Sequence, residues 1–249
     1  MGMHAIDEDE EISITGWDAE EFALRALSSR ASLAAVIDAA LLQPDATRSQ
    51  VGKLCREAAE PGFACVLVNP VWAGLAVSEL AGTGVPVGSV VGFPLGASLG
   101  TSKRDEAAAL VRLGVHEVEM VLSIGQLKCG ENAAVENDIR GVVAVAHAAG
   151  AMVTIVLESG LLTVEEKLRA SDLAIAAGAD FVKTSTGFSA GGAAVDDVAF
   201  LRGVAGGRCG VKALGGIRTL AEAHRMLEAG ANRLCTNVGI NILAELDPR

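Results

Sequence analysis

The stretch DFVKTSTGFSAGGAAVDDVAFLRGVAGGRCGVKALGG, residues 180–216, contains one complete strand–helix–strand unit. Residues 181–185 and 210–213 are short runs of mostly apolar or small residues, as expected of strands buried on both faces. Residues 195–204 between them form an alanine-containing amphipathic stretch that predicts a helix. This unit carries two lysines in otherwise apolar strands, Lys183 and Lys212.

The same alternation extends over most of the chain. Strands are predicted at residues 36–39, 63–68, 87–93, 117–124, 152–158, 181–185, 210–213 and 233–236. Helices are predicted at residues 18–28 with Asp18 as cap, at 31–36, from a cap at Asp45 or Thr47, after Pro70, after Thr101, and at 133–148, 163–177, 195–204 and 220–229. Four of these helices end at a glycine, a common C-cap: Gly114, Gly150, Gly178 and Gly230.

Alternating strands and helices are compatible with a barrel or with a doubly wound open sheet. No GxGxxG follows a strand, which weakens the dinucleotide-binding open sheet. We therefore predict an α/β fold of the (β/α)₈ TIM-barrel type in one domain, residues 31–249. An acidic leader and N-terminal helix, residues 1–30, are expected to precede it, and the acidic run 7–11 is expected to be solvated.

The bulk composition excludes several classes of protein. The formal net charge of −11 comes without a basic stripe, so a nucleic-acid binder is not expected. The five cysteines are scattered without a CxxC pair and the four histidines lack metal-ligand spacing, which predicts reduced thiols and neither metal nor cofactor. The chain shows no membrane-length apolar run and no signal peptide, so a cytoplasmic location is expected.

In a barrel of this type, active sites gather at the C-terminal ends of the strands. The polar or prominent residues near those predicted ends are Asp38, Asn69, Phe93, Glu158, Lys183, Lys212, Thr236 and Asn237. A buried lysine is costly unless it is paired or neutral, so each lysine could be a salt-bridged structural residue. Two lysines on successive strands favour a functional pair, because successive βα units place their strands side by side.

Two neighbouring lysines alter each other's chemistry. A second positive charge and partial desolvation both lower the pKa of an ammonium group. We therefore expect a lowered pKa at Lys183, whose neutral amine could attack a carbonyl and form a Schiff base. Glu119, an acid in the apolar run EVEMVL, is expected to neutralise a lysine, to act as general acid or base, or to do both.

Glycines after the sixth and seventh strands suggest an anion site. Gly187 follows the sixth strand, and Gly215 with Gly216 follows the seventh. Barrels often hold phosphate with the loops after strands seven and eight and a helix N-terminus. Ordinary turns also use glycine pairs, so this alternative stays open.

The chain resembles the deoxyribose-phosphate aldolase family in six motifs that occur in order. They are IDAALLQPDAT, VNP, VVGFPLG, EVEMVLSIG, DFVKTSTGF and VKALGGIRT. The resemblance implies a metal-free barrel that reversibly cleaves 2-deoxy-D-ribose 5-phosphate to acetaldehyde and glyceraldehyde 3-phosphate, in deoxyribonucleotide catabolism. It also implies a small aldehyde or sugar phosphate as the partner and makes a homo-oligomer plausible.

The resemblance implies roles for individual residues. Lys183 would be the Schiff-base lysine, Lys212 the second lysine, and Glu119 the acid of the family's E-[IV]-D-M-V motif. Substrate binding is assigned to the residues that fall on the strand ends and glycine loops: Asp38, Thr186, Gly187, Gly215, Gly216 and Asn237.

The motifs also depart from the family pattern. Glu119 stands where the family has aspartate, and we expect Ala39 and Ala40 to make room for its extra methylene. Leu214 stands for a serine, and Cys235-Thr236-Asn237-Val238 replaces the family's Gly-Thr/Ala-Ser-Ser loop. These departures predict a weaker hold on phosphate. They leave two alternatives: a class I aldolase that acts on a different or non-phosphorylated aldehyde, or a non-catalytic paralogue that binds a metabolite or partner. Retention of both lysines argues against the second.

Overall fold

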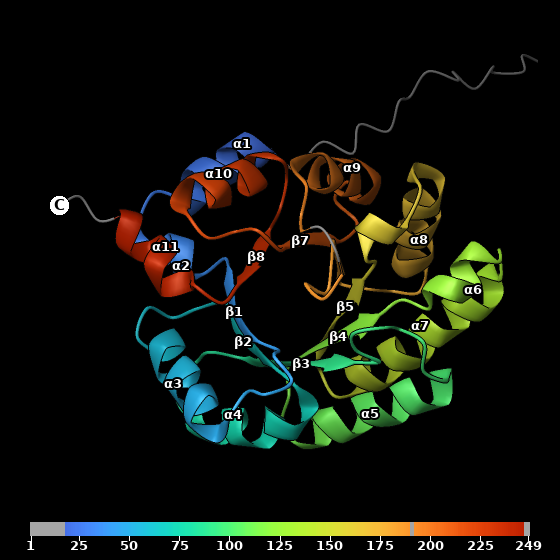
Figure 1. Cartoon of the computed structure of the whole chain (residues 1–249), viewed down its shortest axis with the longest axis horizontal. Helices are drawn as coiled ribbons and strands as arrows, with labels where there is room; N and C mark the ends of the chain where they lie inside the picture. The colour runs from blue at the N-terminus through green and yellow to red at the C-terminus, as the bar shows by residue number, and fades with distance from the viewer. Residues whose placement is uncertain (1–17, 190–191, 247–249) are drawn as a thin grey trace, which may run out of the picture.

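The computed structural model describes residues 18–189 and 192–246. The predicted leader, residues 1–17, lies outside this range. Eight parallel strands close into a barrel in chain order, and helices surround them (Figure 1). The strands are β1 Ile37–Leu41, β2 Cys65–Val68, β3 Val87–Val91, β4 Glu117–Val121, β5 Met152–Val156, β6 Phe181–Lys183, β7 Gly210–Leu214 and β8 Arg233–Thr236. The predicted TIM barrel is confirmed.

The outer layer consists of helices on the convex side of the barrel (Figure 1). They are α1 Ala19–Ala26, α2 Arg30–Ala34, α3 Arg48–Ala59, α4 Ala73–Glu79, α5 Gly100–Arg112, α6 Ile124–Lys128, α7 Asn132–Ala148, α8 Val164–Ala176, α9 Val195–Ala205, α10 Leu220–Glu228 and α11 Gly239–Leu246, with 3₁₀ turns η1 Pro70–Trp72 and η2 Ser159–Leu161. None of these helices is long and apolar enough to cross a bilayer.

The helix ends are capped largely as predicted. Asp18 accepts a hydrogen bond from the Glu21 N–H at 3.0 Å, which confirms it as the cap of α1. Thr47, rather than Asp45, caps α3 and shares a capping box with Gln50. The glycines that follow α5, α7, α8 and α10 all have positive φ, as a left-handed C-cap requires.

Two helices, α6 and α11, were not predicted from the sequence. The fourth strand was predicted to reach residue 124, but β4 ends at Val121 and α6 begins at Ile124. Leu122 is fully buried and Ile124 packs against the core, so the apolar run continues after the strand has ended. Apolarity over so short a run does not distinguish a strand from a helix. The helix α11, which follows β8, was not predicted.

Side chains of each strand point alternately into the barrel and outward to the helices. The register places Lys183 opposite Lys212, and Lys212 opposite Arg233. The outward-facing residues join the helices in the main core, whose members are mostly alanine, valine, leucine and isoleucine. The inward-facing residues fill the barrel in layers, and they include the lysines.

One buried ion pair joins two outer helices to the sheet. Lys103 of α5 is fully buried, and its Nζ donates to Asp138 Oδ2 of α7 at 2.6 Å and to the Val121 carbonyl at 3.1 Å. Gly92, at φ 60°, leaves the space for the Lys103 stem, because a Cβ there would lie 2.9 Å from Lys103 Cε. The lysine thus links α5, α7 and the end of β4 without contact with water.

Removal of the negative partner should leave Lys103 charged and unpaired in the interior. Asp138→Asn, which keeps the side-chain size, should lower the free energy of unfolding by about 3–5 kcal/mol. Glu136→Gln is the matched control on the same helix, because the Glu136–Arg140 pair is solvent-exposed and should contribute less than about 1 kcal/mol. Urea unfolding measures both. Equal stability of the two variants would contradict a structural role for the Lys103–Asp138 pair.

Candidate active site

Six charged side chains meet inside the barrel, and we call them the charge cluster: Asp38, Glu117, Glu119, Lys183, Lys212 and Arg233. Lys183 Nζ lies 2.5 Å from Glu119 Oε2. Lys212 Nζ lies 2.6 Å from Glu117 Oε2, 3.1 Å from Asp38 Oδ2 and 3.3 Å from Glu119 Oε1. One carboxylate, that of Glu119, therefore bridges the two lysines.

Arg233 completes the charge cluster at the start of β8. Its Nε donates to Asp38 Oδ1 at 2.7 Å, and its Nη2 donates to Glu117 Oε1 at 2.9 Å. The ring of Phe181 lies 5.0 Å from Lys212 Nζ, within the range of a cation–π contact. Gly210 is needed beside it, because a Cβ there would lie 2.2 Å from the Phe181 ring. The local sequence thus leaves space for one aromatic ring next to the cations.

The charges around Lys183 act on its pKa differently from the prediction. Burial lowers the pKa of Lys183, whereas an ionised Cys235 and the Glu119 carboxylate raise it, Lys212 lowers it, and the result lies above the ordinary value. Burial raises the pKa of the Cys235 thiol to about 12, so this thiol is neutral at pH 7. Glu119, whose Oε2 lies 2.5 Å from Lys183 Nζ, is therefore the anion that favours the ammonium form of Lys183 at pH 7. The prediction of a lowered pKa at Lys183 counted burial and Lys212, which act in that direction, and omitted the contact with Glu119, which opposes them.

Lys212 is paired with three carboxylates in the resting site. Burial lowers its pKa, but the carboxylates of Asp38, Glu117 and Glu119 raise it well above the ordinary value. Lys212 therefore supplies a positive charge beside Lys183 in the unliganded protein. As predicted from the sequence, this charge acts to lower the pKa of Lys183.

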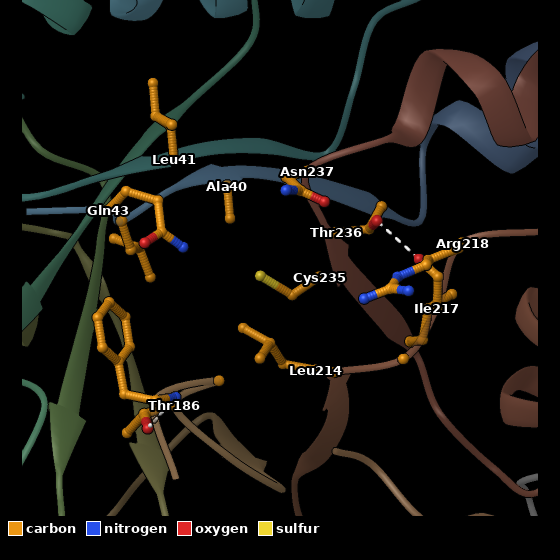
Figure 2. Close-up of a pocket in the computed structure, with 15 residues that line it drawn as sticks. Ala40, Leu41, Gln43, Thr186, Leu214, Ile217, Arg218, Cys235, Thr236 and Asn237 are labelled. Carbon is orange, nitrogen blue, oxygen red and sulfur yellow. Dashed lines mark hydrogen bonds between the residues drawn. The ribbon is translucent and has the colours of Figure 1, made fainter. Parts of the chain in front are cut away.

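A cavity of about 220 Å³ opens at the C-terminal ends of β1, β6, β7 and β8. Its walls are residues 40–43, 186–188, 214–218 and 235–237 (Figure 2). On β7 and β8 the wall begins at Leu214 and Cys235, each two residues beyond its charged neighbour Lys212 or Arg233 along the strand. The charge cluster therefore lies one inward-facing layer below this cavity.

Most of the predicted substrate-binding residues line the cavity. Thr186, Gly187, Gly215, Gly216 and Asn237 all do so. The three glycines have φ of 83°, 108° and 76°, backbone conformations that favour glycine. The predicted catalytic residues, Lys183, Lys212 and Glu119, lie in the charge cluster below.

Asp38 is placed differently from the prediction. It is the second residue of β1 and lies in the charge cluster, so its expected position at the C-terminal end of the strand is wrong. The actual strand runs to Leu41, two residues beyond the predicted end. Ala39 does not make room for Glu119, because it belongs to the main core, whereas Ala40 faces the cavity.

The other strand-end candidates support loops rather than the cavity wall. Asn69 donates to the Leu42 carbonyl at 3.0 Å, and the Phe93 ring meets Phe188 edge-on at 5.2 Å between centroids. Glu158 has a left-handed backbone at φ 56° and accepts hydrogen bonds from the Thr186 N–H and hydroxyl. Glu158 thereby fixes the loop that carries Gly187.

Four residues of this region received no role from the sequence: Glu117, Arg218 and Arg233, which were not singled out, and Cys235, which was noted only in the segment that departs from the family pattern. Glu117 stands two residues before Glu119, and strand alternation predicts the same inward direction for both. Arg218 follows the glycine pair and brings a cation to the cavity wall. Both signals were present in motifs already noted.

Asp38, Cys65 and Glu117 bring three ligand-type atoms within 4.8 Å of one another. The two carboxylates already accept hydrogen bonds from Arg233 and lie beside Lys212. Two fixed cations at this distance oppose the entry of a metal ion. The arrangement therefore suits internal ion pairing better than metal binding.

Comparisons with known proteins point in one direction. Residues 32–243 match the family described as DeoC/LacD family aldolase. The deoxyribose-phosphate aldolase of a Geobacillus species (strain WCH70) is 49% identical over 212 residues, which cover 85% of this chain and 95% of that protein. That of a Thermoanaerobacter species (strain X514) is 48% identical, covering 86% and 96%. The tetrameric deoxyribose phosphate aldolase structure from Aeropyrum pernix has a TM-score of 0.85 at 34% identity, covering 91% and 96%.

The charge cluster predicts a defined pH dependence of stability. Burial raises the pKa of Asp38. The positive charges of Lys212, Arg233 and Lys183 together lower it by more, so this pKa lies below the ordinary value of 3.8. A carboxylate with a lowered pKa stabilises the fold above its unfolded pKa, and this contribution is lost as the pH falls through the folded value. Asp38→Asn should therefore be less stable than the parent at pH 7, and the difference should shrink below about pH 4, by up to about 1.4 kcal/mol per pH unit.

Chemical denaturation from pH 7 to pH 2.5 tests this expectation. Asp172→Asn is the control, because Asp172 forms only an exposed ion pair with Arg208 at 3.7 Å. A stability difference between parent and Asp38→Asn that stays constant across this range would contradict the assigned ion pairs.

Proposed function

The chain belongs to the DeoC/LacD family of aldolases and is itself an aldolase, and from this premise we propose that Lys183 forms a Schiff base with the aldehyde group of the substrate. The proposed reaction is the reversible cleavage of 2-deoxy-D-ribose 5-phosphate to acetaldehyde and D-glyceraldehyde 3-phosphate. The observation that carries the assignment is a buried lysine whose Nζ lies 2.5 Å from a carboxylate and whose neighbour Lys212 is a second buried cation.

The first step is a proton transfer within the charge cluster. Lys183 is an ammonium group in the resting protein and must become a neutral amine before it can attack a carbonyl. Glu119 Oε2 is in hydrogen-bond contact with Lys183 Nζ and can accept that proton. The amine then adds to C1 of the sugar, and loss of water gives the iminium ion.

The iminium ion is the electron sink for bond cleavage. A base removes the proton of the C3 hydroxyl, the C2–C3 bond breaks, and its electron pair forms the enamine on Lys183 while C3 becomes the aldehyde of glyceraldehyde 3-phosphate. Protonation of the enamine at C2 and hydrolysis of the imine by water then release acetaldehyde. Glu119, which contacts both lysines, is the proposed base, directly or through a water molecule.

Lys212 is proposed to act by its charge and as a proton donor. Its Nζ lies 3.3 Å from Glu119 Oε1, so gain or loss of a proton at Glu119 changes the electrostatic interaction with Lys212 directly. Asp38, Glu117 and Arg233 are positioning residues in this scheme, because they hold Lys212 in place without facing the cavity.

The phosphate is proposed to bind at the outer end of the cavity. The backbone N–H groups near Gly187, Gly215 and Gly216 are suited to an anion, and Arg218 adds a guanidinium group. Thr186 and Asn237 complete this wall. Arg218 offsets part of the loss of polar groups that the sequence departures predicted.

Three further assignments rest on the family. We propose that residues 31–249 form one catalytic domain, that copies of the chain associate, and that the protein works in the cytoplasm in deoxyribonucleotide catabolism. The Aeropyrum pernix relative, which is tetrameric by its description, supports association.

Borohydride trapping tests the nucleophile. With acetaldehyde and borohydride, the parent should gain a two-carbon adduct on Lys183, located by peptide mass mapping. Lys183→Arg should lose the adduct and at least about a thousandfold of aldol activity, because arginine does not provide a neutral amine. Lys128→Arg, at an exposed pair with Glu166, is the control and should keep both. An adduct on another lysine would refute the assignment.

Glu119 variants separate the formation of the Schiff base from later steps. Glu119→Gln removes the anion that raises the pKa of Lys183, so trapping should extend to lower pH, whereas turnover should fall by about a hundredfold or more. Glu119→Asp should also be slower than the parent, because the shorter side chain withdraws from one of the lysines.

The surface variant Glu60→Gln controls for the change of charge. The trapping profile and kcat are measured together. Parental turnover in Glu119→Gln, or faster turnover in Glu119→Asp, would show that Glu119 is not the working acid and base.

A further inference from the structure

A buried carboxylate with an unusual backbone lies beside the loop that follows β6. Glu158 is 3% exposed and has a left-handed backbone, with φ 56° and ψ 57°. Among the residues that the structure describes, Glu158 is the only one other than glycine with a positive φ. Such conformations persist where the surrounding structure fixes them, and they are concentrated at functional sites. The backbone of Glu158 thus indicates a functional constraint at this position.

The partners of the Glu158 carboxylate all belong to Thr186. Its Oε2 accepts hydrogen bonds from the Thr186 N–H at 3.1 Å and from the Thr186 hydroxyl. Within residues 18–189 and 192–246, the carboxylate forms no ion pair with a lysine, arginine or histidine. The Thr186 oxygen in turn accepts a hydrogen bond from the Phe188 N–H at 3.1 Å (Figure 2). The N–H groups on both sides of Gly187 are therefore occupied by side chains.

The N–H group of Gly187 itself is unpaired. Neither this N–H nor that of Gly216, on the loop after β7, has a hydrogen-bond partner in the part of the chain that the structure describes. Both glycines line the cavity, as does the cation Arg218. An N–H group of this kind takes water or a ligand as its partner, and successive free N–H groups in turns bind anions. The two loops therefore suit a phosphate group.

The residues around Gly187 fix the position of this loop. Gly187 has φ 83°, and a Cβ there would lie 2.8 Å from Leu214 Cδ2. The Leu214 N–H donates to the Thr184 hydroxyl at 3.1 Å, and the Ser185 hydroxyl donates to the Leu214 carbonyl at 2.5 Å. The hydroxyls of Thr184, Ser185 and Thr186 are thus engaged in holding the two glycine loops.

We propose that Glu158 is a positioning residue for phosphate recognition: acting through Thr186, it holds the Gly187 N–H group in place to donate to the phosphate of the substrate. This inference rests on the proposed function, because it takes 2-deoxyribose 5-phosphate as the substrate. Glu158 is not part of the cavity wall, so it acts on the phosphate through this loop. A donor that is fixed beforehand removes the cost of ordering the loop when the substrate binds.

Glu158→Gly and Glu158→Gln form a matched pair of variants. Glycine tolerates the left-handed backbone but removes the acceptor, whereas the amide oxygen of glutamine can accept both hydrogen bonds from Thr186 without a negative charge. Glu158→Gly should raise the KM for 2-deoxyribose 5-phosphate about tenfold or more. Its kcat, and its kcat/KM for unphosphorylated 2-deoxyribose, should stay within about threefold of the parent. Glu158→Gln should stay within about threefold of the parent for both sugars.

Binding of inorganic phosphate provides a readout that needs no turnover. In an NMR titration, phosphate should shift the amide signal of Gly187 in the parent and in Glu158→Gln, and Glu158→Gly should need about tenfold more phosphate for the same shift. A parental signal of Gly187 that does not respond to phosphate overturns the inference. Parental KM values in Glu158→Gly, or an equal loss for both sugars as expected of a merely structural residue, overturn it too and leave the Lys183 assignment standing.

The outcomes separate this inference from the proposed function. A parent that cleaves neither sugar and forms no adduct on Lys183 overturns the proposed function, and the phosphate titration then decides the inference. If Glu158→Gly does not fold, Thr186→Val takes its place, because it removes only the hydroxyl that Glu158 and Phe188 share. Thr186→Val should show the same selective rise in KM, and an unchanged KM in this variant would contradict the role of Glu158.

Discussion

The contact between Lys183 and Glu119 is the interaction on which the site depends. A charged lysine in the interior of a barrel has lost its water, and only a well-placed partner offsets that cost. Glu119 provides this partner at 2.5 Å and extends its other oxygen toward Lys212. Lys212 also forms ion pairs with Asp38 and Glu117, and both of these carboxylates form ion pairs with Arg233. Three acidic and three basic side chains thus neutralise one another, and they come from five strands of the same closed sheet: β1, β4, β6, β7 and β8.

This dependence links the chemistry to the fold. Parallel strands in strict order bring residues from positions 38 to 233 into one cluster, because each strand turns alternate side chains inward. The lysines of the charge cluster are buried, with Lys183 1% and Lys212 0% exposed, and the exclusion of water strengthens the electrostatic interactions between these side chains. In the proposed mechanism, Glu119 both stabilises the resting lysine and accepts its proton. Under this proposal, stability and reactivity depend on the same contact.

Much of this arrangement could be predicted from the sequence. Short apolar runs and helix-ending glycines were sufficient for all eight strands, and two lysines on successive strands indicated the site. The balance of charge around Lys183 was not predictable in the same way. It depends on the distance from Glu119 on β4 to Lys183 on β6, a relation between strands that are not neighbours in the sheet. Arg233 was not singled out, and Cys235 was noted only as a departure from the family loop, because their contacts depend on how β8 is placed beside β7 and β1, which the sequence does not reveal.

We infer that Glu119 holds Lys183 as an ammonium ion until substrate arrives. An NMR titration of the unliganded protein, with lysines labelled at the ε-carbon, measures this directly. The Lys183 signal should keep the chemical shift of a charged lysine from pH 6 to beyond its ordinary pKa of 10.5, and the Lys183→Arg variant identifies the signal by its absence. A Lys183 signal that titrates to the neutral amine near pH 7 would contradict it.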